Sequence, residues 1–177
     1  QSQHLGDYAA ALAGLRDRGL VYPCFCTRAD IAASLAAPHG APADGAPLYP
    51  GTCRHLGAAE RERRLAQEAH CWRLDMARAV AIAGPLVWEE EGRGPRAADP
   101  AAHGDVVLAR KDAPASYHLA STIDDAAMGV TLVVRGADLI ASTDVHRLLQ
   151  ALLGFATPVY RHHALVCGAD EIGRAHV

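Results

Sequence analysis

The chain has 177 residues, of which 50% are hydrophobic, and a formal net charge of -3. This composition is typical of one well-cored globular domain, and the near-neutral charge argues against indiscriminate binding to nucleic acid. The sequence contains nothing close to the roughly 18 uninterrupted apolar residues of a membrane span, and its polar start, QSQHLGDY, is unlike a signal peptide, so we expect no membrane partner and a cytoplasmic location.

Helix and strand signals alternate along the chain and predict an α/β fold. Apolar residues recur at helical spacing between Leu5 and Leu15, and Gly19 follows as a stop. An Ala-, Pro- and Gly-rich stretch at 38–51 indicates an insertion. Further helices are predicted at 58–69, 117–129 and 142–154, strands at 20–26, 71–76, 85–90, 105–110, 130–136 and 158–162, and a loop at 91–104. Such alternation predicts a parallel sheet covered by helices.

The helix at 142–154 has well-marked ends. Ser142 or Thr143 is expected to cap it, Asp144 suits its first turn, and Gly154 is expected to end it.

Three of the five cysteines form a pattern that is typical of a metal site. Cys24 and Cys26 lie two residues apart in VYPCFCT, and Cys53 ends the motif LYPGTC. A Cys-x-Cys pair on a turn and a third thiolate from a returning loop supply three corners of the tetrahedron that Zn²⁺ prefers. We predict one structural Zn²⁺ held by Cys24, Cys26, Tyr49 and Cys53, with His55 as the substitute for Tyr49.

The remaining thiols receive a different interpretation. An odd number of cysteines in a reducing compartment favours metal binding or buried thiols over a disulfide framework. Cys71 and Cys167 each lie alone on an apolar strand candidate, so both are expected in the core. His39 is a third and more distant candidate for the fourth metal ligand. The interpretation that competes with a metal site is that three buriable thiols happen to lie in one loop-rich region.

The segment YHLASTIDDAAMGVTLVVRGADLIASTDVHRLLQALLG, at 117–154, carries the most specific signal. It resembles the second half of the catalytic domain of glutamate-specific class I aminoacyl-tRNA synthetases, in which a Tyr, an Asp-Asp pair, a strand ending in Arg-Gly and a capped helix recur in this order. Together with the cysteine-containing insertion, the resemblance covers nearly the whole chain. The stretch RGADLIAST is similar to the short glutamyl-queuosine tRNA(Asp) synthetases, whereas full-length glutamyl-tRNA synthetases more often have Arg-Gly-Glu-Asp-His here.

The resemblance implies a Rossmann-like catalytic domain with a zinc-binding insertion. It also implies a monomer that activates L-glutamate with ATP, in the presence of Mg²⁺, and transfers the glutamyl group to the queuosine base of tRNA(Asp). By the same resemblance Tyr117 and Arg135 contact glutamate, and Asp124 and Asp125 are architectural. His162 and His163 are expected to be structural, with one of them close enough to contact ATP.

Other functions compete with this interpretation. A full-length glutamyl-tRNA synthetase that charges tRNA(Glu) would share most of these residues, and a noncatalytic zinc-containing binding protein could use the same fold. A zinc-dependent nucleic-acid-binding module would explain the thiols and the basic cluster of Arg61, Arg63 and Arg64, but it leaves the chain after Cys53 without a role.

The ends of the sequence depart from the family pattern. Neither the His-Ile-Gly-His-type motif nor the Lys-Met-Ser-Lys-Ser-type loop, which bind ATP in the family, is present, so catalytic residues stay unassigned. We expect residues 1–171 to be a partial catalytic domain, truncated at both ends, with the zinc-binding insertion at 21–56. One set of codons for 172–177 matches the start of a common sequencing adapter, so we expect a non-native tail there and no activity from this chain alone.

Overall fold

The computed structural model describes residues 4–35 and 48–165. Most of the predicted insertion at 38–51, as well as His39, Cys167 and the tail at 172–177, therefore lies outside the described residues. In chain order the elements are α1 (Leu5–Asp17), β1 (Val21–Cys24), α2 (Arg28–Leu35), α3 (Ala58–Gln67), β2 (Cys71–Leu74), α4 (Met76–Ala83), β3 (Val87–Glu90), β4 (Gly94–Ala97), η1 (Pro100–His103), β5 (Val107–Ala109), α5 (Tyr117–Ala127), β6 (Leu132–Gly136), η2 (Ala137–Leu139), α6 (Ile140–Leu153) and β7 (Val159–His163).

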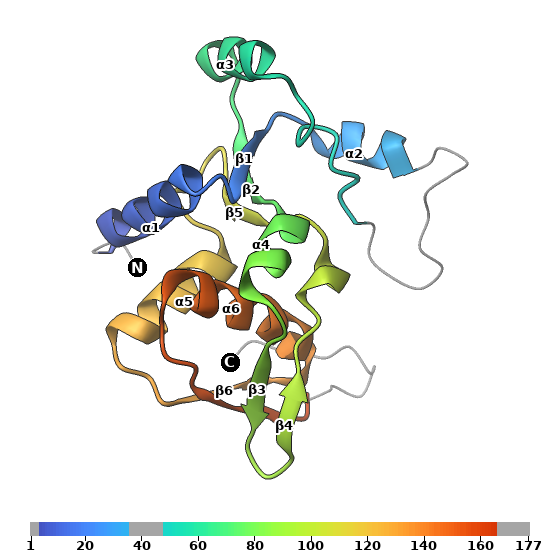
Figure 1. Ribbon diagram of the computed structural model, residues 1–177. Coiled ribbons are helices and arrows are strands. Elements are labelled where there is room, and N and C mark those ends of the chain that lie inside the picture. Colours follow the sequence, from blue (N-terminus) through green and yellow to red (C-terminus); the bar gives the residue numbers. More distant parts are fainter. Residues whose placement is uncertain (1–3, 36–47, 166–177) are drawn as a thin grey trace.

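The strands in the described part of the chain form two separate sheets. A three-stranded sheet has the order β1-β2-β5, and all of its pairs are antiparallel. A four-stranded sheet has the order β4-β3-β7-β6, in which β3 and β6 both run parallel to β7. Helices α5 and α6 lie between the two sheets in Figure 1. The expected α/β fold is confirmed, but the parallel part comprises only three strands of the second sheet.

The sequence-based prediction lacks helices α2 and α4, strand β4 and the short helices η1 and η2. Helix α4 begins at Asp75, whose carboxylate accepts a hydrogen bond from the backbone N–H of Arg78, and it ends at Gly84, whose φ is 69°. The segment predicted as a loop at 91–104 contains β4, which forms an antiparallel hairpin with β3. Glycine and proline disfavour a central strand, but an edge strand tolerates a residue without an N–H donor, and β4 is an edge strand.

The predicted cap of helix α6 is wrong at its start and correct at its end. The N-cap residue is Leu139, with no side-chain cap, because the short helix η2 runs directly into α6. Ser142 and Thr143 therefore lie inside the helix, and the hydroxyl of Thr143 makes other contacts. Gly154 ends the helix in the left-handed conformation, with φ of 74°.

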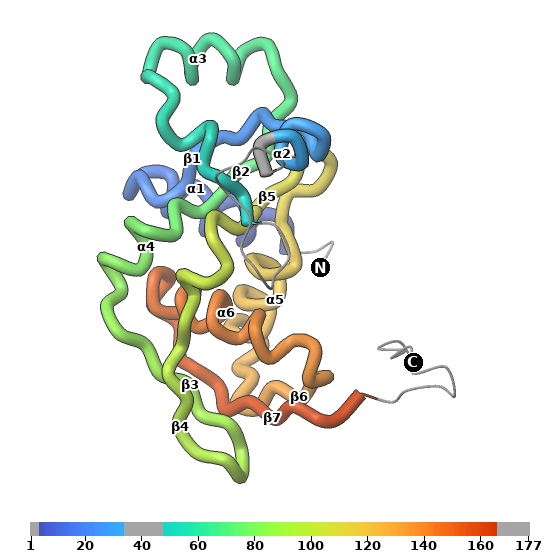
Figure 2. Tube along the Cα trace, turned by 90° about the vertical axis from the view of Figure 1, so that its right-hand side faces the viewer, coloured from blue at the N-terminus to red at the C-terminus, as the bar shows by residue number. Residues whose placement is uncertain are grey.

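The core joins the helices to both sheets. Tyr8, Leu12 and Leu15 of α1 are buried, as their spacing predicts, although Leu5 is exposed. The hydroxyl of Tyr8 donates a 2.6 Å hydrogen bond to Asp124 of α5, which agrees with an architectural role for that carboxylate. The buried side of α6 contributes Val145, His146, Leu148, Leu149, Gln150 and Leu152, and Figure 2 shows this helix beside α5.

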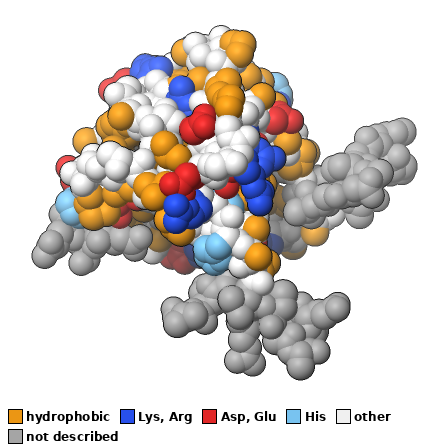
Figure 3. Space-filling model, turned by 90° about the horizontal axis from the view of Figure 1, so that it is seen from below, with side chains coloured by type: hydrophobic (Ala, Val, Ile, Leu, Met, Phe, Trp, Pro, Cys, Tyr) orange, Lys and Arg blue, Asp and Glu red, His pale blue; other side chains and the backbone are white. Residues whose placement is uncertain are grey.

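The outer face of the four-stranded sheet is mixed in character. Val87, Leu132 and Val134 expose apolar side chains there, whereas Glu89 and Arg161 expose charged ones. Figure 3 shows hydrophobic and charged side chains interspersed over the face seen from below. Among the described residues, no helix combines the length and the hydrophobicity that are needed to cross a membrane.

Candidate functional site

The carboxyl ends of three parallel strands bring the candidate site together. Arg135 lies near the end of β6 opposite His162 of β7, and Glu90 is the last residue of β3. Ligands of open α/β sheets bind at this edge, because the strands end there and the following segments diverge. The candidate residue Arg135 therefore lies where the fold favours a binding site.

Every nitrogen of the Arg135 guanidinium has a partner. Nη1 donates to the hydroxyl oxygen of Tyr117, at 3.3 Å, and to Nδ1 of His146, at 3.1 Å. Nη2 donates to Oγ1 of Thr143, at 2.5 Å, and Nε donates to Nε2 of His162, at 3.2 Å. All four acceptors are neutral groups, so the site holds a guanidinium by hydrogen bonds alone.

Tyr117 and Arg135 meet although 18 residues separate them in the sequence. Tyr117 is the first residue of α5, where Ser116 caps the helix by accepting a hydrogen bond from the N–H of Leu119. Its side chain is 49% exposed, so its hydroxyl lies at the surface beside the guanidinium. The structure thus brings the side chains of both predicted glutamate contacts within hydrogen-bond distance of each other.

The buried carboxylate of Glu90 binds His162, which in turn contacts Arg135. Glu90 accepts hydrogen bonds from the backbone N–H of His162, at 2.9 Å, and from its ring nitrogen Nδ1, at 2.8 Å. Burial acts to raise the pKa of Glu90, but the two hydrogen bonds from His162, together with the positive charge of Arg93, act in the opposite direction, and the pKa lies below the usual value. Because Nε of Arg135 can only donate, Nε2 of His162 must accept, and His162 is therefore the neutral tautomer with its proton on Nδ1.

The cysteines of the predicted metal site lie together at the other end of the molecule. The sulfur atoms of Cys24, Cys26 and Cys53 are all within 4.8 Å of one another, and Sγ of Cys26 is 3.5 Å from Sγ of Cys53. Sulfur ligands of a tetrahedral Zn²⁺, at about 2.3 Å from the metal, are separated by about 3.8 Å. The three thiols therefore fit one face of a zinc tetrahedron.

Tyr49 lies at the fourth side of this thiol cluster. Its hydroxyl oxygen is 3.5 Å from Sγ of Cys26 and accepts a 2.9 Å hydrogen bond from the N–H of Cys53. Burial raises the pKa of Tyr49, so a phenolate there requires the charge of a bound cation. His55 is exposed and does not belong to the group of converging ligand atoms.

Cys71 is buried, as expected, but it is not isolated from the other thiols. It lies on β2 directly opposite Cys24 of β1. A hydrogen bond from Cys71 lowers the pKa of Cys24 to about 4 against the effect of burial, whereas burial raises the pKa of Cys26 to about 11. A cation bound to the cluster would favour the thiolate form of each ligand.

A basic cavity of about 550 Å³ opens beside the thiol cluster. Cys26 and Ser116 line it together with four basic side chains, those of Arg28, Arg73, Arg110 and Lys111. Arg110 is paired with Asp112. The predicted basic cluster on α3 is less available: Glu60 binds Arg63, Glu68 binds Arg64, and Arg61 donates to backbone carbonyl groups.

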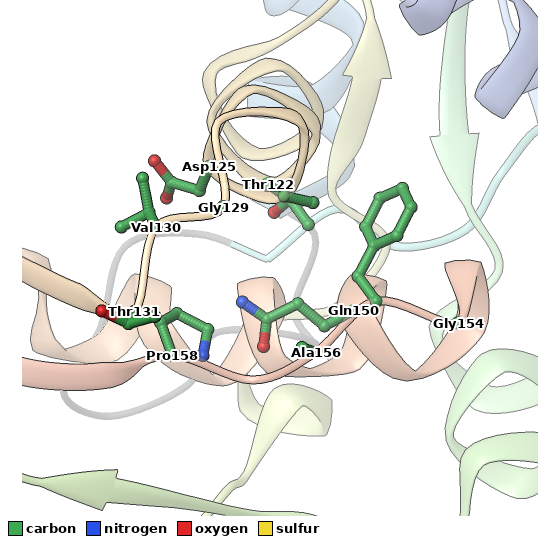
Figure 4. A pocket seen from close by; sticks show the side chains of 11 residues that line it. Thr122, Asp125, Gly129, Val130, Thr131, Gln150, Gly154, Ala156 and Pro158 are labelled. Carbon is green, nitrogen blue, oxygen red and sulfur yellow. The ribbon is translucent and has the colours of Figure 1, made fainter.

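A second cavity, of about 400 Å³, lies at the opposite, amino ends of the parallel strands. Figure 4 shows Thr122 and Asp125 of α5 above it and Gln150 of α6 below. Gln150 donates to the hydroxyl oxygen of Tyr160, and the other amide atom, Oε1, is buried without a hydrogen-bond partner. None of the predicted site residues lines this cavity.

The sequence analysis does not assign three residues around Arg135 to the site. It predicts Thr143 as a helix cap and gives no role to His118 or His146. His118 and Tyr117 are consecutive on α5, and His146 is 11 residues after Arg135 on the helix that follows β6. A histidine on a strongly apolar helix face was the available signal, but such a residue is equally compatible with an ordinary core position.

Known proteins match nearly the whole length of this chain. The family model for the catalytic domain of class I tRNA synthetases (E and Q) matches residues 1–172. The chain is 43% identical to a glutamyl-Q tRNA(Asp) synthetase from Rhodobacter capsulatus, with 98% of this chain and 63% of the relative covered. It is 44% identical to the protein of the same name from Leptothrix cholodnii, with 96% and 56% covered, so the chain spans between half and two thirds of these relatives.

Solved structures show the same fold. A glutamate tRNA ligase from Elizabethkingia meningosepticum, crystallised in complex with its amino acid, superimposes with a TM-score of 0.76 at 23% identity. The match covers 94% of this chain and 34% of that protein. A glutamate-tRNA synthetase from Elizabethkingia anophelis also gives a TM-score of 0.76, at 22% identity.

Proposed function

The chain belongs to the catalytic-domain family of the class I tRNA synthetases for glutamate and glutamine, and from this membership we propose that its protein activates glutamate with ATP. The acceptor that we propose is the queuosine base of tRNA(Asp). The names of the relatives that are 40–44% identical support this acceptor. The observation that carries the proposal is the pairing of Arg135 with Tyr117 at the carboxyl ends of the parallel strands.

The chemistry of this pair suits a substrate with carboxylate groups. A guanidinium offers planar donors that match the two oxygens of a carboxylate, and a phenol adds a donor at its side. The partners of Arg135 leave its positive charge uncompensated, because none of the ion pairs in the described part of the chain includes it. A carboxylate ligand would supply the missing charge.

The proposed reaction has two steps. A carboxylate oxygen of glutamate attacks the α-phosphorus of ATP, the bond to pyrophosphate breaks, and pyrophosphate leaves with Mg²⁺ as its expected counter-ion. A hydroxyl group of the RNA then attacks the acyl carbon, and AMP leaves. In this scheme Arg135 and Tyr117 bind and orient glutamate, which lowers the barrier by positioning. Proton transfer is not assigned to any residue of this chain.

The basic cavity beside the thiol cluster supports an RNA partner. It starts at Ser116, which immediately precedes Tyr117, and extends to Cys26. Basic side chains around a cavity attract a phosphate backbone. We propose that RNA approaches the glutamate site from this side.

We further propose that Cys24, Cys26, Tyr49 and Cys53 hold one Zn²⁺ within an insertion at 21–56. The role is structural, because four protein ligands complete a tetrahedron and leave no position for a substrate. Zinc would fix the segment around Cys53 to strand β1, since these ligands come from separate parts of the chain. Chelation of the metal is then expected to loosen this region and not to stop the chemistry directly.

Glutamate-dependent ATP–pyrophosphate exchange by the intact protein tests the proposed function. We expect Arg135→Ala to raise the KM for glutamate about 10- to 100-fold, because a hydrogen bond to a charged group contributes about 1.5–3 kcal/mol. Arg161→Ala is the matched control, since Arg161 lies on the neighbouring strand with an exposed side chain. An unchanged KM in Arg135→Ala would contradict the assigned contact.

The acceptor is tested in parallel reactions. Radiolabelled glutamate should be transferred to queuosine-containing tRNA(Asp) and not to tRNA(Asp) that lacks queuosine. Labelling of the 3′ end of tRNA(Glu) instead would identify a glutamyl-tRNA synthetase. A protein that binds these RNAs but shows no exchange would be a noncatalytic binding protein.

A further inference from the structure

His146 occupies a position between Arg135 and a second histidine. It is 2% exposed on helix α6, and its Nδ1 accepts the hydrogen bond from Nη1 of Arg135. Its Nε2 lies 3.1 Å from Nδ1 of His118 on α5. The planes of the two imidazole rings meet at 71°, in an edge-to-face arrangement. The centre of the Tyr117 ring lies 5.3 Å from the centre of the His146 ring.

The donors and acceptors in this chain of contacts have one consistent assignment. Arginine only donates, so Nδ1 of His146 carries no proton and its Nε2 does. That N–H donates to Nδ1 of His118, which must then be unprotonated. Both imidazoles are therefore neutral.

The electrostatics favour the same state. Burial, helped by the positive charge of Arg135, lowers the pKa of His146 to about 2. Burial also lowers the pKa of His118 to about 4, and the charges of His103 and Arg135 act in the same direction. These two histidines do not titrate in the range where an unperturbed histidine does.

We propose that His146 is a positioning residue, whose neutral imidazole orients the Arg135 guanidinium toward a substrate carboxylate without cancelling its positive charge. This inference rests on the proposed function, because it assigns a purpose to the geometry of the glutamate site. An acidic residue at the same place would also accept a hydrogen bond, but it would neutralise the guanidinium and compete with the substrate. A neutral acceptor gives orientation and leaves the charge for the ligand.

Three substitutions separate orientation from charge. His146→Gln keeps a neutral side chain that offers an acceptor oxygen to Arg135 and an N–H to His118. His146→Leu removes both hydrogen bonds at similar volume, and His146→Glu keeps an acceptor but adds a negative charge. Gln150→Leu is the matched control, because Gln150 is also buried on α6, one turn further on, and its side chain donates to the hydroxyl of Tyr160 instead of to a group of the Arg135–His146–His118 chain.

The measurement is the KM for glutamate and for ATP in pyrophosphate exchange by the intact protein, together with the melting temperature of each variant. We expect His146→Gln to stay within about 3-fold of the wild type. His146→Leu should raise the glutamate KM about 10- to 100-fold, the range for loss of one hydrogen bond to a charged group, with the ATP KM unchanged. His146→Glu should raise the glutamate KM by about the same factor, because its carboxylate neutralises Arg135 and competes with the substrate. Gln150→Leu should leave both KM values unchanged even if it lowers the melting temperature.

The pH profile of the glutamate KM tests whether the imidazole of His146 is neutral. Arg135 of β6 and His118 of α5 contact His146, Tyr117 of α5 and His162 of β7 contact Arg135, and His103 of η1 acts on His118. The glutamate KM of the wild type and of His146→Gln should follow the same curve between about pH 5.5 and 8. A titration present only in the wild type would overturn the neutral assignment.

Two further results would overturn the inference. One is a folded His146→Leu variant with an unchanged glutamate KM, and the other is a His146→Glu variant that behaves like His146→Gln. If the wild type shows no glutamate-dependent exchange at all, the proposed function fails instead. The crystal structure of His146→Leu then decides the positioning role, which requires that the guanidinium of Arg135 leave its place beside Thr143.

Discussion

Replacement of Glu90 by glutamine should destabilise the protein, because Glu90 is a buried carboxylate with two donors aimed at it. Both the backbone N–H and the ring Nδ1–H of His162 donate to it, at 2.9 and 2.8 Å. The amide of glutamine has a single acceptor oxygen, so one donor would lose its partner and face an NH₂ group instead. Glu90 itself is 2% exposed, so water cannot easily replace the lost partner.

The size of the effect follows from one hydrogen bond to a charged group. Its loss costs about 1.5–3 kcal/mol, and the lower desolvation cost of a neutral amide offsets a part of this. We therefore expect Glu90→Gln to lower the free energy of unfolding by about 2 kcal/mol at neutral pH. Glu89→Gln on the same strand is the control, since Glu89 is exposed and should change stability by less than about 0.5 kcal/mol.

The pH dependence has a defined sign. The pKa of Glu90 in the folded protein is lower than the usual value of a glutamate, so the ionised form stabilises the fold above that usual value. This stabilisation is lost as the pH falls through the folded-state pKa, below about pH 4.3. The difference between wild type and Glu90→Gln should then shrink, because a protonated Glu90 resembles glutamine.

Urea unfolding in steps from pH 7 down to about pH 3, which passes through the lowered pKa, measures both effects, with the slope of the transition as a check on two-state behaviour. A Glu90→Gln variant as stable as the wild type at pH 7 would refute the argument. The argument would also be refuted if the difference in unfolding free energy between wild type and Glu90→Gln stayed constant on acidification.

Two other predictions concern the region around β1. The hydroxyl of Tyr22 donates a 2.5 Å hydrogen bond to the buried carboxylate of Asp105. Tyr22→Phe should therefore lower the free energy of unfolding, measured with urea, by about 1.5–3 kcal/mol. An unchanged free energy of unfolding would mean that water replaces the hydroxyl. Elemental analysis should find one zinc per chain in the wild type and in Cys71→Ala but not in Cys53→Ser, since Cys53 belongs to the group of converging thiols and Cys71 does not. A metal-free wild type would end the zinc proposal.

Much of the local structure is determined by the sequence itself. The spacing of Tyr8, Leu12 and Leu15 specifies a helix with one buried face, and Gly154 ends α6 because glycine adopts a positive φ without strain. These features depend on residues close together in the chain. The family resemblance of 117–154 likewise rests on the order of residues, and from it Tyr117 and Arg135 could be named as a pair that the fold brings to 3.3 Å.

Contacts between distant segments could be decided only by the tertiary structure. The pairing of β1 and β2 places Cys71 opposite Cys24, 47 residues away. The N-cap of α6 is Leu139, so the hydroxyl of Thr143 inside the helix is free to bind Arg135. The periodicity of α6 shows that His146 is on the apolar face but not which neighbour faces it. That neighbour is a guanidinium, and the burial that surrounds it keeps the imidazole neutral, because desolvation disfavours a second positive charge.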